Sequence, residues 1–558
     1  MLGVRSLFTL LFLVQLVFLV QSGERQDDEN MHDFSDFQVG AKSDRTAKSN
    51  IRAEEKESEY WIKHAVHHVH HRVNCVKPNT KIAKNIILFL GDGMGVSTQT
   101  AARIYQGQLN GQNGEENSLF FETLPYSGVS KTYCVDAQVA DSACTSTAYT
   151  NGVKASIGTM GLNAKVSIGD CKASKDSSTH TSSIVDWAIK AGKSTGVVTT
   201  TRITHASPGG NYAHIASRDW ECDTDRPKGV DCEDIASQLI NQYPGNKINV
   251  LLGGGRSKFT LQGNVGGGQR LDKDLLKSYA DMRTKAKESY SIAKTVWDLE
   301  KVNASNTDYL LGLFAEGHMN YKLENHVYQP TLEEMTVKAI EILSKNKNGF
   351  YLFVEGGKID MAHHSSQAKK ALSETIEFDN AIKRAYNMTK HDETLIVVTA
   401  DHSHTFTMAG YPERGTNILA KARYGGQDFQ GEDKLPYLTL GYNNGPGGRT
   451  SEGQRRNVSG EKTDDDNYVF PSGINLKSET HGGEDVLVFA TGPWAHILTG
   501  SFEQNFIPVA MSYAARIGPG NQGPLVSGES SLLLSGSQLQ TLLMSLGMVV
   551  VCKLLKDT

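Results

Sequence analysis

Short runs of apolar residues recur through the middle of the chain and alternate with segments of helical periodicity. The runs do not alternate between apolar and polar residues, which is typical of parallel strands covered on both faces. Between them, segments 182–191 and 331–343 have the spacing of amphipathic helices. This order predicts an α/β fold: a doubly wound, mostly parallel central sheet flanked by helices. The expected strands are 86–90, 195–199, 249–252, 351–354, 395–399 and 486–490.

Residues 405–478 interrupt this alternation, because they are rich in Gly, Asn, Asp and Arg and show little helical periodicity. We interpret them as a subdomain inserted into the sheet domain. The alternative is a long disordered loop. Within the insertion, the composition of residues 435–441 favours a strand.

Both ends of the chain differ from the middle. Residues 1–22 combine an early positive charge, an apolar run and small residues, which is the pattern of a secretory signal peptide; the alternative is an uncleaved anchor. Residues 23–58 form a polar leader. Residues 519–558 contain a linker and then an apolar stretch at 539–555, the order of a glycosylphosphatidylinositol (GPI) anchor signal. A retained membrane helix is the alternative. We therefore expect passage through the secretory pathway and attachment to the outer leaflet of the plasma membrane.

Charge and cysteine content narrow the choice of partners and compartment. Lysine plus arginine (57) nearly balances aspartate plus glutamate (62), so no basic surplus favours binding to nucleic acid. Secretion permits disulfides, but the cysteines allow many pairings, and their spacing does not give the connectivity. Glycosylation sequons begin at Asn303, Asn387 and Asn457.

Polar side chains follow most of the predicted strands at their carboxyl ends, where ligands bind in open α/β sheets. Several buried carboxylates in one pocket would repel one another unless cations neutralise them. A mixed histidine and carboxylate set without cysteine suits zinc, and an oxygen-richer corner suits magnesium. The residues at these ends are Asp92, His205, Ser207, Glu355, Asp360, His363, His364, Asp401, His402, His404 and His481.

Ser142 is a candidate nucleophile. The segment around it is small and polar and then compatible with a helix, which would place its hydroxyl at a helix N-terminus that favours an anion. The alternative is an ordinary helix-capping serine. No histidine is adjacent in sequence, so coordination to a divalent cation would have to activate the hydroxyl.

Taken together, these segments resemble the alkaline phosphatases of the animal, membrane-attached type. The matching segments include Asp92-Gly-Met-Gly-Val-Ser and Asp141-Ser-Ala-Cys-Thr-Ser-Thr-Ala-Tyr. The resemblance places an alkaline phosphatase domain at 59–518, with 405–478 as its crown-like insertion. The other matching segments are 201–208, 212–218, 251–256, 355–364, 399–404 and 479–486.

The resemblance implies hydrolysis of phosphate monoesters at alkaline pH by a homodimer with two zinc ions and one magnesium ion per subunit. Ser142 would form a phosphoserine, and Arg218 would clamp the phosphate. A disulfide between Cys171 and Cys232 is also implied. The implied ligands are Asp360, His364 and His481 for one zinc; Asp92, Asp401, His402 and, during catalysis, Ser142 for the other; and His205, Ser207, Glu355 and the bridging Asp92 for magnesium.

Met361 and Cys144 are among the residues that depart from the family pattern. Met361 stands where mammalian relatives have histidine and bacterial ones lysine, which leaves the pH optimum and rate open. Cys144 replaces a small residue near the nucleophile, as a packed thiol or as half of a disulfide. The alternative function is a catalytically inactive, surface-anchored binding protein, but no implied ligand or nucleophile is missing.

Five histidines lie between residues 64 and 71. In a helix, His64, His68 and His71 would share a face. We interpret this stretch as a solvated helix of varied sequence, with adventitious metal binding as the alternative.

Overall fold

The computed structural model describes residues 52–263, 267–324, 327–448 and 453–521. The expected signal peptide, residues 23–51 of the polar leader and the anchor signal lie outside these ranges. Residues 52–58 of the leader are described and include a short 3-10 helix, Ala53–Lys56, whose Glu55 is buried. No helix in the described ranges has both the length and the apolar character needed to cross a bilayer.

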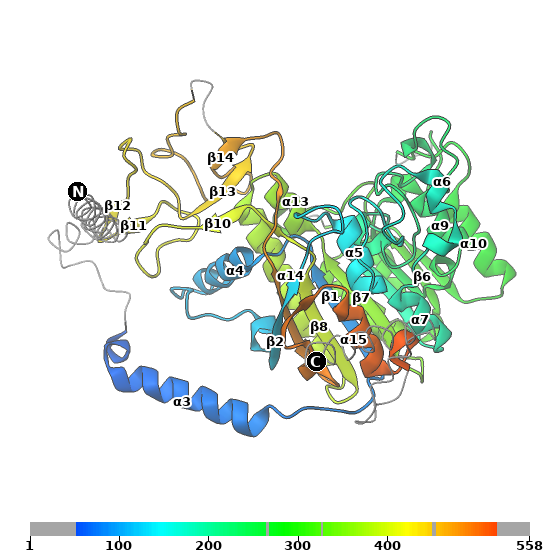
Figure 1. Ribbon diagram of the computed structural model, residues 1–558, viewed down its shortest axis with the longest axis horizontal. Helices are drawn as coiled ribbons and strands as arrows, with labels where there is room; N and C mark the ends of the chain where they lie inside the picture. Colours follow the sequence, from blue (N-terminus) through cyan, green and yellow to red (C-terminus); the bar gives the residue numbers. More distant parts are fainter. Residues whose placement is uncertain (1–51, 264–266, 325–326, 449–452, 522–558) are drawn as a thin grey trace, which may run out of the picture. The chain divides into compact units, whose positions relative to one another are not determined.

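A ten-stranded sheet forms the centre of the domain (Figure 1). Its order is β17-β2-β16-β8-β1-β7-β3-β4-β6-β5, and the seven strands from β8 to β5 are all parallel. The predicted mostly parallel sheet is therefore confirmed. The strands are β1 (Asn85–Gly91), β2 (Tyr126–Lys131), β3 (Ser194–Arg202), β4 (Val250–Gly254), β5 (Tyr290–Ala293), β6 (Tyr309–Leu313), β7 (Phe350–Gly356), β8 (Thr394–Ala400), β16 (Val486–Thr491) and β17 (Gly500–Glu503).

All six predicted strands form, but the direction of one differs from the prediction. Strand β16 runs antiparallel to both of its neighbours, β8 and β2. Its apolar sequence reflects burial, and burial does not specify the direction of a strand. Strands β2, β5, β6 and β17 were not predicted from the apolar runs.

Helices cover both faces of the sheet, as the doubly wound prediction requires (Figure 1). Alternate side chains of β1 show this: Ile87 and Phe89 pack in a core with α4, α12 and α14, whereas Ile86 and Leu88 pack in a core with α7, α9 and α15. The helices are α3 (Ser58–Cys75), α4 (Val96–Leu109), α5 (Ser142–Asn151), α6 (Cys171–Ser174), α7 (Ile184–Lys190), α8 (Ala206–Gly209), α9 (Ile235–Asn241), α10 (Leu275–Lys285), α11 (Val296–Lys301), α12 (Leu332–Leu343), α13 (Lys358–His364), α14 (Ala368–Met388) and α15 (Phe506–Ala515).

The described part of the 405–478 segment forms small sheets outside the central one. β10 (Phe406–Met408), β13 (Leu440–Gly445) and β14 (Ser472–Asn475) form one sheet, and β11 (Arg423–Tyr424) pairs with β12 (Gln427–Asp428). The expected strand at 435–441 mostly forms isolated bridges, and a regular strand starts only at Leu440. A proline at position 436 explains this difference, because proline has no N–H to donate to a ladder.

A fully buried arginine, Arg270, ties two segments of the domain together. Its Nη1 and Nη2 donate to the Asp234 carboxylate at 2.8 and 2.9 Å, and its Nε donates to Asp272 at 2.8 Å. We expect Arg270→Met to lower the free energy of unfolding by about 3–5 kcal/mol, because it leaves a buried carboxylate unpaired. Urea unfolding measures this change. Lys277→Ala, which breaks the exposed pair with Asp281, is the control and should change little; equal effects of the two variants would contradict the prediction.

Candidate active site

Polar side chains lie at the carboxyl ends of four neighbouring parallel strands, β8, β1, β7 and β3. Asp401 follows β8, Asp92 follows β1, Glu355 lies near the end of β7, and His205 follows β3. All four residues are buried. The structure therefore brings together side chains that are far apart in the sequence.

A glycine permits the close packing at these strand ends. Gly93 has a φ of +68°, and a Cβ atom on it would lie 2.3 Å from Nε2 of His404. Only glycine can make this turn after β1 without displacing His404.

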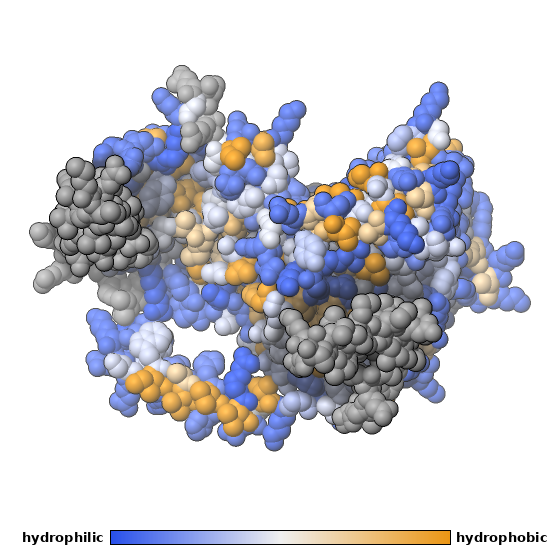
Figure 2. Space-filling view, in the orientation of Figure 1, coloured by the Kyte–Doolittle hydropathy of each residue, from blue (hydrophilic) through white to orange (hydrophobic). Residues whose placement is uncertain are grey.

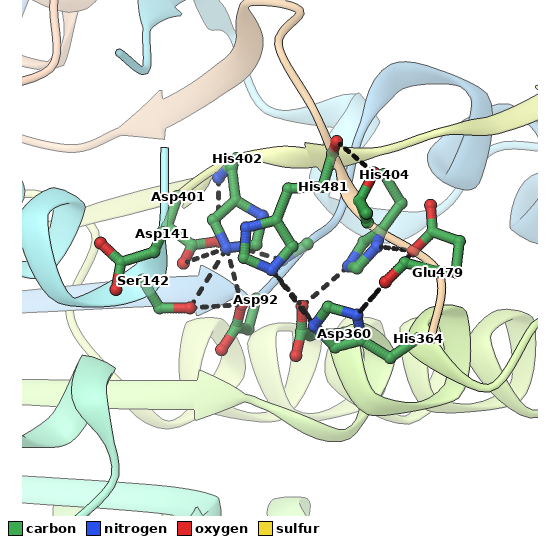
Figure 3. A network of polar contacts seen from close by, with 12 residues as sticks. Asp92, Asp141, Ser142, Asp360, His364, Asp401, His402, His404, Glu479 and His481 are labelled. Carbon is green, nitrogen blue, oxygen red and sulfur yellow. Dashed lines mark hydrogen bonds and ion pairs between the residues drawn. The ribbon is translucent and has the colours of Figure 1, made fainter. Parts of the chain in front are cut away.

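The first of three ligand clusters contains Asp360, His364 and His481 (Figure 3). Asp360 and His364 lie one turn apart on α13, as their spacing predicts, and His481 belongs to the short strand β15 (His481–Gly482), which pairs with β9 (Ser403–His404). Nε2 of each histidine lies 3.4 Å from Oδ1 of Asp360, and the two Nε2 atoms are 3.2 Å apart.

The tautomers of these two histidines favour a cation between them. Nδ1 of His364 donates to the Glu479 carbonyl at 2.6 Å, and Nδ1 of His481 donates to the Ala140 carbonyl at 2.7 Å. In neutral rings the two Nε2 atoms are then acceptors that face each other and a carboxylate, with no proton between them. A metal ion between the rings would bind both Nε2 atoms and the carboxylate, and so would remove the repulsion between these acceptors. Hydrogen bonds from Nδ1 to carbonyl groups are also the contacts that orient metal-binding histidines.

The second cluster contains Asp92, Asp401 and His402, all fully buried. Nε2 of His402 lies 3.3 Å from Oδ2 of Asp401 and 3.6 Å from Oδ1 of Asp92. Burial lowers the pKa of His402 well below its ordinary value, which keeps the ring in the neutral form that binds metals.

The third cluster contains Asp92, His205 and Glu355, and the Ser207 hydroxyl donates to Oδ2 of Asp92 at 3.5 Å. Among the described residues, Nδ1 of His205 and Oε1 of Glu355 have no hydrogen-bond partner although both atoms are buried. Unpaired buried polar atoms are unfavourable, so they mark a place for a ligand. Burial also raises the pKa of Glu355 to about 7.

The charge of the three clusters fits the binding of cations. Burial raises the pKa of Asp92 well above its ordinary value, and the charges of Asp401 and Asp360 raise it further. Divalent ions would offset this repulsion. The donor sets therefore fit the metals that the sequence implies.

Ser142 is the first residue of α5 and is almost fully buried. Its Oγ lies 3.1 Å from Nε2 of His402 and 3.5 Å from Oδ1 of Asp92. The helix cap is Asp141, whose carboxylate accepts the N–H groups of Ala143 and Cys144, both at 3.2 Å. Ser142 is therefore not the capping residue, and its hydroxyl faces the second cluster.

Arg218 lies between the nucleophile segment and the third cluster. Its Nη1 donates to Oδ2 of Asp141 at 3.1 Å, and its Nη2 lies 3.0 Å from Nε2 of His205. Asp141 thus caps α5 and holds the guanidinium at the same time. This role of Asp141 was not predicted, and its position directly before the candidate serine was the only signal in the sequence.

His404 and Glu479 hold Asp360 of the first cluster in place, and both ring nitrogens of His404 are used in doing so. Nε2 of His404 contacts Oδ1 of Asp360 at 2.8 Å, and its Nδ1 contacts Oε2 of Glu479 at 2.5 Å (Figure 3). Burial lowers the pKa of His404, but these hydrogen bonds outweigh it and raise that pKa to about 9. Both ring nitrogens of His363 form hydrogen bonds, one with the hydroxyl group of Thr98 and the other with that of Tyr442. Glu479, two residues before His481, was not predicted.

Two disulfides are present in the described residues. Cys171–Cys232 confirms the implied pair. Cys144 pairs with Cys134, which decides between the two alternatives for that residue. This second bridge closes a loop that contains both Asp141 and Ser142.

Met361 lies on α13 beside Lys358, whose Nζ is 3.7 Å from its sulfur. Burial lowers the pKa of Lys358 to about 8. The amine next to the thioether is therefore a cation at neutral pH and loses its charge as the pH rises through about 8.

Comparison with known proteins identifies the family. Residues 83–517 match the alkaline phosphatase family. The chain is 45% identical over 486 residues to the membrane-bound alkaline phosphatase of Bombyx mori, which covers 84% of this chain and 87% of that protein. It is 44% identical over 484 residues to the human tissue-nonspecific alkaline phosphatase, with 84% and 91% of the two chains covered. The chain therefore belongs to the alkaline phosphatase family.

Solved structures agree on the fold. The alkaline phosphatase from the Antarctic bacterium TAB5 superimposes with a TM-score of 0.55 at 24% identity, covering 79% of this chain and 99% of that one. At this level of identity the match supports the α/β architecture alone.

Proposed function

We propose that this alkaline phosphatase hydrolyses phosphate monoesters to an alcohol and inorganic phosphate at alkaline pH, through a phosphoserine on Ser142. The observation that carries the proposal is the position of Ser142 Oγ, buried at the start of α5 and 3.1 Å from the neutral His402. Backbone N–H groups at a helix N-terminus favour an anion such as phosphate.

The proposal includes two zinc ions and one magnesium ion. When bound, these ions supply Lewis-acid chemistry that lowers the pKa of a hydroxyl group and offsets charge on phosphate oxygens. The residues that would hold them are Asp360, His364 and His481 for one zinc; Asp92, Asp401, His402 and Ser142 for the other; and Asp92, His205, Ser207 and Glu355 for magnesium.

The proposed reaction has two displacement steps, with Ser142 as the nucleophile in the first and as the leaving group in the second. Ser142 Oγ attacks phosphorus, the ester P–O bond breaks, and the alcohol leaves with a proton. Water then attacks the phosphoserine, the Oγ–P bond breaks, and Ser142 regains its hydroxyl as inorganic phosphate departs. Arg218, fixed by Asp141, offers its other N–H groups to the non-bridging oxygens, where charge is concentrated.

No observation favours the inactive binding protein as a second function. The nucleophile, the guanidinium and every implied ligand are present and close together.

We further propose that the protein is a GPI-anchored homodimer at the cell surface, with the 405–478 segment at the subunit interface. The relative from Bombyx mori is a membrane-bound alkaline phosphatase, which supports membrane attachment. Two disulfides and the exposed sequon residues Asn303, Asn387 and Asn457 are compatible with secretion.

The proposal is tested by hydrolysis of p-nitrophenyl phosphate and of the diester bis(p-nitrophenyl) phosphate at alkaline pH. We expect the monoester to be strongly preferred. Arg218→Ala should lower kcat/KM for the monoester roughly 10²–10³-fold, because charged donors to the transition state are lost.

Arg256→Ala is the matched control for this variant. The side chains of Arg218 and Arg256 are similarly exposed (23% and 22%), but Arg256 pairs with Glu316, which is not one of the site residues. Equal loss of activity in the two variants, or preference for the diester, would contradict the proposal.

A further inference from the structure

Helix α3 (Ser58–Cys75) has two chemically different faces. Ile62, Val66, Val69 and Val73 recur at intervals of four, three and four residues and form an exposed apolar row, which Figure 2 shows along the helix. At 3.6 residues per turn, the opposite face carries four histidines. These histidines are His64, His67, His68 and His71, and all four are exposed.

The four histidines form two pairs with a spacing of four residues. His64 pairs with His68, and His67 pairs with His71, so each pair spans one helical turn on one face. Two histidines at positions i and i+4 of a helix are the arrangement that binds zinc in the His-Glu-x-x-His motif. A fifth histidine, His70, has no histidine four residues away.

The imidazoles of these pairs are available to a ligand. Within the described ranges none of the four makes a hydrogen bond or an ion pair. The ring contacts are between His64 and Tyr60, with centroids 4.5 Å apart, and between His67 and His68, with centroids 6.5 Å apart. The histidines of the first cluster differ, because Nδ1 of His364 and Nδ1 of His481 each donate to a backbone carbonyl group.

We propose that the histidine face of α3 is a surface site for a divalent transition-metal ion, with zinc as the natural occupant. Imidazole ligands select zinc, copper or nickel over calcium and magnesium. Each pair supplies two ligands of a tetrahedral ion, so two positions stay open for water or for a group of another molecule. This site is additional to the three catalytic clusters, to which α3 contributes no residue, and it does not depend on the proposed reaction.

The test uses the full chain with its catalytic clusters first loaded with zinc and magnesium and excess metal removed. Zinc is then titrated in competition with a chromophoric zinc indicator. The wild type should take up about two further zinc ions, one for each pair. The variant His64→Ala/His67→Ala breaks both pairs but keeps three histidines, and its affinity for the added zinc should fall at least tenfold.

His70→Ala is the matched control, because it removes an exposed histidine from the same helix without breaking a pair. It should retain the zinc uptake of the wild type. Alanine favours helix, so all variants should keep the thermal unfolding temperature and the phosphatase activity of the wild type. The proposal is overturned if the wild type takes up no additional zinc, if the double variant takes up as much as the wild type, or if His70→Ala loses as much as the double variant.

Discussion

Replacing Ser142 with alanine is expected to lower kcat for p-nitrophenyl phosphate by roughly 10⁴-fold or more, the range seen when a catalytic nucleophile is removed. The variant lacks the oxygen that forms the phosphoenzyme, which lies 3.1 Å from Nε2 of His402 and 3.5 Å from Oδ1 of Asp92. Metal content should stay close to that of the wild type, because the histidine and carboxylate ligands remain.

A second serine on the same helix provides the control. Ser146 is buried one turn after Ser142, but its hydroxyl donates to the Ala143 carbonyl at 2.7 Å and not to the clusters. Ser146→Ala should therefore retain turnover. Acid quenching with ³²P-labelled substrate should trap labelled protein from the wild type and none from Ser142→Ala. Substantial turnover by a metal-loaded Ser142→Ala would rule out the phosphoserine route.

Removal of the metal ions is expected to abolish activity completely and to lower the thermal unfolding temperature. The three clusters bury Asp92, Glu355, Asp360 and Asp401 close together, so without cations their charges repel one another in a low-dielectric site. Dialysis against a chelator, followed by metal analysis and activity assays, measures both effects. Zinc plus magnesium should restore activity, whereas calcium alone should not.

A ligand variant makes this prediction specific to the clusters. His364→Ala should lose about one zinc ion per chain and reduce turnover at least 10²-fold, since outer contacts alone are worth 10–100-fold. His391→Ala changes an exposed histidine outside the clusters and should retain both metal and activity. Full turnover by protein from which no zinc or magnesium can be detected would disprove metal dependence.

The apolar runs were enough to predict most of the central sheet. Strands such as β1 and β8 are buried on both faces, and this burial leaves a continuous apolar signature. Strand β2 (Tyr126–Lys131) has partly exposed residues, so its sequence lacks that signature. The direction of β16 was not predictable either, because it depends on where the chain returns after the 405–478 segment.

The residues of the candidate site could be predicted where they lie at the carboxyl end of a buried strand. Asp92, Glu355 and Asp401 follow or end apolar runs, which a single sequence displays. Arg218 came from the family resemblance alone, since it lies in an irregular segment. The roles of Asp141 and Glu479 depend on contacts with distant residues, and local sequence does not encode such contacts.

The order in which the ligands occur along the chain has a consequence for biosynthesis. They extend from Asp92 to His481, and the strands that present them are neighbours in space but not in sequence. A chain that emerges from the ribosome cannot complete the first cluster until the segment after residue 478 has left the exit tunnel and β15 has paired with β9. Completion of the first cluster is therefore a late event, because it requires a chain that has been synthesised through His481 and folded so that this residue meets Asp360 and His364.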